Sequence, residues 1–215
     1  TGRFTRYRND PEDPTSLSHR IAYRVYEDHR GVIWVGTEGG LNRYVPESDD
    51  FVRYPYRDFP DGAYQYDPPV HTGDPAFQPD NPHALASPAV TAILEDQEDR
   101  LWVGTRYGGL NRLDRTTDRF VAYPFDPAYE PENPNTFSGN SVRELMVDQE
   151  GRLWVSSAHW NLDETRTYAR LGLEQLDPET DTITRFQADP EDPCALPHQA
   201  VWRMYQDRRG TLWFH

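Results

Sequence analysis

The chain of 215 residues contains no lysine, 22 arginines and 36 acidic residues, which gives a formal net charge of −14. Nucleic acids and anionic membrane surfaces would repel so acidic a chain, so its composition argues against nucleic-acid binding. The sequence also shows no signal peptide and no apolar run near the roughly 18–20 residues of a membrane-spanning helix, and the lone Cys194 allows no internal disulfide.

One sequence pattern occurs four times, and its copies define the predicted elements. Each copy contains a turn that begins with aspartate and a strand with a central tryptophan, as in "DHRGVIWVGT" and "DQEDRLWVGT". In chain order we predict the last strand of a preceding unit, a complete unit, an insertion, two further complete units and the first two strands of another unit. The corresponding ranges are 1–8, 19–56, 57–87, 88–125, 140–187 and 200–215.

The second unit illustrates the internal order of strands. Its first strand, "AVTAILED", alternates, so Val90, Ala92 and Leu94 are predicted to share one face. The turn that follows needs a positive φ at its end, which Gly31 supplies in the first unit and Asp99 tolerates in the second. Three further strands follow as "RLWVGT", "LNRLD" and "RFVAYP". Each unit is therefore predicted to be a sheet of four short antiparallel strands.

Sheets of this kind must pack on one another, because a single one cannot bury both faces. Repetition around an axis gives an all-β fold, the β-propeller of four-stranded antiparallel blades, here as a partial propeller of about three and a half blades. A β-sandwich and a linear solenoid are the alternatives. The tryptophans predicted to lie between blades are Trp34, Trp102, Trp154 and Trp213. Trp202, in a first strand, is also predicted to lie in the core, and the open blade edges suggest a homodimer.

The strings "GVIWVGTEGGLNRY" and "DRLWVGTRYGGLNRLDRTTDRFVAYP" resemble the two-component regulator propeller repeat. The resemblance weakens in the third copy, where "VSSAHW" replaces the V-G-T step. It implies the periplasmic or other extracytoplasmic sensor propeller of a hybrid histidine kinase, which is attached to the membrane only through segments outside this sequence. It further implies that binding of a small nutrient or glycan is passed on as a signal by dimers.

The predicted insertions fall on one rim, formed by the connections between units and the turns between second and third strands. Loops of one elaborated rim are the expected place for binding. Aromatic rings there suit the apolar faces of sugars, and polar side chains suit their hydroxyls, although such rings can also merely pin loops to the scaffold. The candidate ligand-binding residues are Glu38, Arg106, Tyr107, His159, Trp160 and Asn161.

No catalytic residue, metal site or cofactor is predicted. The seven histidines lack ligand spacing, and no nucleophile motif or phosphate-binding loop occurs. The chain is therefore predicted to bind a small molecule or oligosaccharide and not to be an enzyme. Two alternatives remain: a propeller lyase or hydrolase whose carboxylates come from separate blades, and a protein–protein assembly module with an apolar patch on its rim.

Overall fold

The computed structural model is built from β-strands. It describes residues 2, 4–57, 76–123, 125, 136–160, 168–186, 188–189, 191–192, 195–196 and 201–215, with the backbone alone at 159–160 and 168–171. Over these residues it contains no helix long and apolar enough to cross a membrane.

Within the described residues, the strands form four antiparallel sheets in which neighbours in the chain pair with one another. The first sheet contains β1 (Ala22–Glu27), β2 (Ile33–Thr37), β3 (Gly40–Val45) and β4 (Asp50–Arg53). The second contains β5 (Val90–Glu95), β6 (Leu101–Thr105), β7 (Leu110–Asp114) and β8 (Arg119–Ala122). The third contains β9 (Ser141–Val147), β10 (Leu153–Trp160), β11 (Tyr168–Asp177) and β12 (Thr182–Phe186). The fourth contains β13 (Met204–Gln206) and β14 (Leu212–Phe214).

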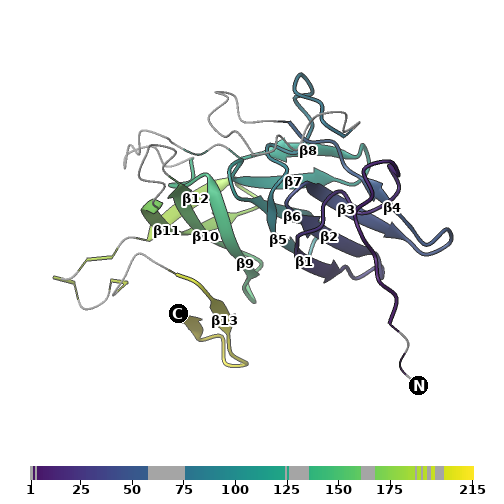
Figure 1. Ribbon diagram of the computed structural model, residues 1–215. Helices are drawn as coiled ribbons and strands as arrows, with labels where there is room; N and C mark the ends of the chain where they lie inside the picture. The colour runs from purple at the N-terminus through teal and green to yellow at the C-terminus, as the bar shows by residue number, and fades with distance from the viewer. Residues whose placement is uncertain are drawn as a thin grey trace.

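Successive sheets pack against each other, and their first strands lie next to one another along one side of the assembly. The strands β1, β5, β9 and β13 contact one another in that order and follow one another from right to left in Figure 1. One cluster of buried apolar side chains fills each of the three junctions between sheets. This arrangement is a partial β-propeller, so the predicted fold class is confirmed.

The repeated tryptophans occupy the junctions. Trp34, Trp102 and Trp154 are buried, and each belongs to a different inter-sheet cluster. Trp213 is 55% exposed, because no described sheet covers its face. The prediction that these rings pack between blades is therefore confirmed for three of them, while the fourth lies on an open sheet face.

The aspartate that opens each turn also holds the tryptophan of its sheet. The indole N–H of Trp34 donates to Asp28 Oδ2 over 2.8 Å, while Asp28 Oδ1 accepts the backbone N–H groups of Arg30 and Val32. Burial alone would raise the pKa of Asp28, but hydrogen bonds from Trp34 and Arg115 outweigh it and hold the pKa below its usual 3.8. The same contacts recur in the other sheets at Asp96, Asp148 and Asp207.

A tyrosine just after the last strand of each of the first two sheets, Tyr54 or Tyr123, reaches the next sheet. Tyr54 donates its hydroxyl to Asp118 Oδ1 over 3.1 Å, and Asp118 lies in the turn before β8. Tyr7, in the segment predicted to be the last strand of a preceding unit, donates to Asp49 Oδ1 over 2.5 Å. The contact of Tyr7 with Asp49 is thus equivalent to the contact of Tyr54 with Asp118. The N-terminal segment therefore packs on the first sheet as the end of the first sheet packs on the second.

The predicted alternation along β5 is wrong at the start of the strand. Val90 packs with Ile93 toward the first sheet, whereas Ala92 packs toward the third. The cause is a β-bulge, since the pairing with β6 skips Thr91 and so reverses the faces on its two sides.

Val142 of the third sheet lies against Gly104 of the second. A Cβ added at Gly104 would lie 2.5 Å from Val142 Cγ1. Gly104→Ala should therefore lower the free energy of unfolding by about 1–3 kcal/mol through overpacking. Urea denaturation would measure this loss. The double variant Gly104→Ala, Val142→Ala should lose less than the sum of the two single variants, and strict additivity would contradict the contact.

Candidate functional site

The first strand of each complete sheet contains a bulge at the same place, near the start of the strand. The strand pairing skips Tyr23 in β1, Thr91 in β5 and Arg143 in β9. A bulge removes a residue from the hydrogen-bonded ladder and redirects its side chain. All three bulge residues line a single groove beside the first strands.

The fourth sheet contributes Trp202 to this groove. The backbone N–H groups of Trp202 and Arg203 both donate to the carbonyl of His215, which repeats the two-to-one pairing of the other bulges. The Trp202 ring is 52% exposed, and the guanidinium of Arg143 lies 4.1 Å from its centroid. The prediction that Trp202 lies in the core is therefore wrong, because the irregular pairing turns the side chain toward the groove.

The groove has a volume of about 370 Å³, within the roughly 300–1,000 Å³ of sites for small molecules. Contacts between first strands hold its base together: Thr91 Oγ1 donates to the carbonyl of Val142 over 2.6 Å, and Arg24 Nε donates to the carbonyl of Thr91 over 3.2 Å. Because the bulges lie near the starts of the first strands, the groove lies near the rim on which the sequence predicts the insertions.

One carboxylate and several guanidinium groups face one another in the groove. Glu144 Oε2 accepts from Arg24 Nη2 over 2.9 Å and from Arg203 Nη1 over 2.7 Å. These three residues come from the first, third and fourth sheets, so the ion pairs connect sheets that are not all neighbours in the chain.

Two of the predicted site residues, Glu38 and Arg106, lie together at the edge of this groove. Arg106 Nη2 donates to the Tyr23 hydroxyl over 2.8 Å, and its Nη1 lies 3.5 Å from Glu38 Oε1. The Tyr23 hydroxyl in turn donates to Glu38 Oε2. Burial lowers the pKa of His19, which lies near Glu38, below its usual 6.5.

Of the other four predicted site residues, Tyr107 alone has a described side chain. Tyr107 is 2% exposed, so its ring offers no face to a ligand, and the candidate site does not include it. His159 and Trp160 end β10, where only their backbone is described, and Asn161 lies outside the described residues. Their role in binding stays a prediction.

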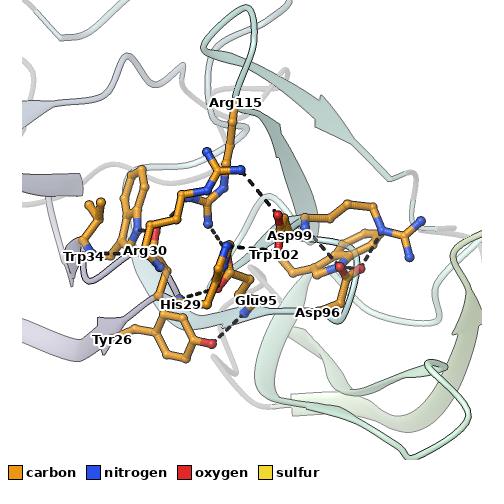
Figure 2. Close-up of polar contacts among 12 residues, drawn as sticks. Tyr26, His29, Arg30, Trp34, Glu95, Asp96, Asp99, Trp102 and Arg115 are labelled. Carbon is orange, nitrogen blue, oxygen red and sulfur yellow. Dashed lines mark hydrogen bonds and ion pairs between the residues drawn. The ribbon is translucent and has the colours of Figure 1, made fainter.

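The opposite rim carries a polar cluster between the first and second sheets. Figure 2 shows Arg115, His29 and Glu95 pointing toward one another. His29 Nδ1 lies 2.9 Å from Glu95 Oε2 and its Nε2 lies 3.3 Å from Asp99 Oδ1, while Arg115 Nη2 lies 2.5 Å from Glu95 Oε1. A metal ion here would compete with Arg115, and with Arg30 beside Asp99. The cluster is therefore an ion-pair network between sheets.

A larger depression, of about 530 Å³, also opens on the opposite rim, between the second and third sheets. Arg100 and Arg152 line it, and each donates to the carboxylate that opens its own turn, Asp96 or Asp148, at 2.6 and 2.7 Å. The two arginines of this depression thus stabilise the turns of their own sheets. We therefore favour the groove beside the first strands as the binding site.

Comparison with known proteins agrees with this architecture. A family model described as two component regulator propeller matches residues 16–39, 84–107, 136–159 and 195–215. No curated protein is significantly similar in sequence to the chain.

Three solved structures illustrate the structural likeness. The extracellular domain of BT4673 from B. thetaiotaomicron, named as a hybrid two-component system, superposes with a TM-score of 0.61 and 22% identity, over 93% of this chain and 22% of that one. Virginiamycin B lyase from Staphylococcus aureus gives 0.51 and 15% over 90% and 48%. PorZ, a component of the type-IX secretion system of Porphyromonas gingivalis, gives 0.51 and 17% over 90% and 23%. At these identities the likeness concerns the fold, and the chain spans less than half of each of these proteins.

Proposed function

The chain belongs to the two-component regulator propeller family, and from this we propose that it is the ligand-binding part of an extracytoplasmic sensor whose bound ligand is a small glycan. In this proposal the groove beside the first strands binds the glycan without chemical turnover. Signal output and membrane attachment belong to segments outside this sequence.

The observation that supports this proposal is the convergence of four bulge residues from four consecutive sheets on one groove. Two of them, Tyr23 and Trp202, are aromatic, and flat rings of this kind pack against the apolar faces of sugars. The hydrogen-bonding groups of Glu38 and Arg106 lie beside Tyr23. A ligand that contacts all four sheets would stabilise one arrangement of them over others, which is the physical requirement for a sensor.

The groove can be tested with Trp202→Ala. If the exposed indole packs against a sugar, this change should weaken glycan binding by about 1–3 kcal/mol in titration calorimetry with a panel of trisaccharides. Trp213→Ala is the matched control, because Trp213 is similarly exposed but lies outside the residues that line the groove. Equal losses in the two variants would contradict the proposed site. Cleaved sugars detected by chromatography would favour the lyase or hydrolase alternative.

A second expectation concerns association of two copies. Val25 on the first sheet and Tyr205 and Trp213 on the fourth are exposed apolar side chains. We propose that these faces can bind a further copy of the chain, and sedimentation velocity at increasing concentration would detect the dimer. A monomer at all concentrations would contradict it.

A further inference from the structure

We propose that the ligand of the groove is an acidic saccharide, whose carboxylate or sulfate group is bound by guanidinium groups of the first strands and of one rim turn. This inference rests on the proposed function of the groove as a saccharide site. It specifies the charge of the ligand, which the repeat sequence does not reveal.

The charge of the groove is opposite to that of the chain. The formal net charge of the chain is −14, yet the lining of the groove includes four arginines and a single carboxylate, that of Glu144. These arginines are Arg24, Arg106, Arg143 and Arg203. Because guanidinium is planar and donates two parallel N–H bonds, it matches the two oxygens of a carboxylate or sulfate. An excess of positive charge in a concave site also concentrates anions there.

Glu144 shows how a carboxylate is held in this groove. A single oxygen, Oε2, accepts from both Arg24 and Arg203, at 2.9 and 2.7 Å. The side chain of Arg203 is 66% exposed, so a ligand can reach it from solvent. An acidic ligand would therefore compete with Glu144 for guanidinium groups that already converge on one anionic oxygen.

The aromatic rings of the groove lie next to the same charges. The guanidinium of Arg143 lies 4.1 Å from the Trp202 ring centroid, and that of Arg106 lies 4.9 Å from the Tyr23 ring centroid. An apolar ring face and a positive charge are thus presented side by side at two places. A sugar with an acidic substituent offers the complementary pair, an apolar ring face and an anionic group.

The inference can be tested with matched pairs of trisaccharides that differ only in charge: glucuronate and glucose, galacturonate and galactose, and mannuronate and mannose. A 6-sulfated galactose trisaccharide distinguishes sulfate from carboxylate. Titration calorimetry on the full chain at 50 and 300 mM NaCl measures each affinity. We expect at least one acidic member to bind about tenfold or more tightly than its neutral partner, with an affinity that falls as salt screens the charges.

Two variants locate the effect. Arg203→Gln should weaken binding of the acidic sugar about tenfold, and Glu144→Gln should strengthen it, because the internal competitor loses its charge. Arg208→Gln is the control, since Arg208 is exposed in the β13–β14 turn on the opposite rim, and it should leave the affinity unchanged. Arg203→Gln should fold normally, as thermal unfolding can verify.

The outcomes separate the two proposals. Neutral sugars that bind as tightly as their acidic partners, or an Arg203→Gln variant with parent affinity for the acidic sugar, would overturn the inference and leave the glycan site in place. Failure of every member of the panel to bind would overturn the proposed function together with the inference.

Discussion

The Trp102→Ala variant should unfold with a free energy about 3–5 kcal/mol below that of the parent chain, whereas Trp213→Ala should lose about 1 kcal/mol or less. The two tryptophans occupy the same place in their repeats and differ in what covers them. Trp102 is fully buried between the second and third sheets, and Trp213 lies on an open face. Urea denaturation followed by tryptophan fluorescence or far-UV circular dichroism measures both losses.

The size of the Trp102 effect has two sources. Removal of the ring leaves a cavity in the inter-sheet cluster, which the surrounding strands fill only in part. It also removes the indole N–H that donates to Asp96 Oδ2 over 2.7 Å, so the buried carboxylate loses a partner. Similar losses in the two variants would contradict the conclusion that the sheets are held together by rings between them.

The second large effect is expected at Glu174. This side chain is fully buried in β11, where Oε1 accepts from the backbone N–H of Ser138 and from the hydroxyls of Ser138 and Ser157. No partner of Oε2 is found among the described residues. Glu174→Gln keeps an acceptor oxygen and removes the charge, so it should raise the free energy of unfolding at pH 8 by about 1–3 kcal/mol.

The pH dependence provides the sharper measurement. Burial raises the pKa of Glu174 above its ordinary 4.5, so the folded chain binds this proton more tightly than the unfolded chain does. The stability contributed by the protonated carboxyl is fully present below pH 4.5 and is lost as the pH rises through the folded-state pKa. The advantage of Glu174→Gln should therefore vanish near pH 4. Glu98→Gln, in an exposed turn, is the control, and an equal response to pH in both variants would contradict this interpretation.

Much of the fold could be predicted because the residues of the repeat show where its tight turns lie. Gly31 and Asp99 end equivalent turns and have φ values of 75° and 62°, as the turn sequences predict. Once the turns are located, the strands between them follow. The predictions of four-stranded sheets and of buried tryptophans between them depend on little else, and both describe the structure well.

The groove could not be predicted from strict alternation, because the bulges interrupt it. A signal was nevertheless present in "WVGT", since a glycine inside a strand often marks a bulge or a close approach of another chain segment. Gly36 fulfils this role for the second sheet: a Cβ there would lie 2.6 Å from Val90 Cγ1. The position of Val90 over Gly36 is a tertiary contact, so the sequence of β5 alone does not contain it.

The buried carboxylate was beyond sequence reasoning for a different reason. Glu174 stands where the first two sheets have Asn42 and Asn111, and it accepts a backbone N–H from Ser138 as those asparagines accept from Ser18 and Ala86. The glutamate side chain, although longer than asparagine, thus makes the same hydrogen bond to the backbone as in the other two sheets. Its complete burial follows from the packing around β11, which a weakened third copy of the repeat does not reveal.

Because of the bulges, some of the residues that line the groove differ from the residues that pair the strands. A bulge residue lies outside the hydrogen-bonded ladder, so its side chain can be exchanged without shifting the strand pairing. Each sheet contributes one bulge residue, near the start of its first strand. Specificity could therefore drift during evolution, or be redesigned, one sheet at a time. These four positions now hold tyrosine, threonine, arginine and tryptophan. Different combinations of side chains at them would give different binding sites on the same strand pairing.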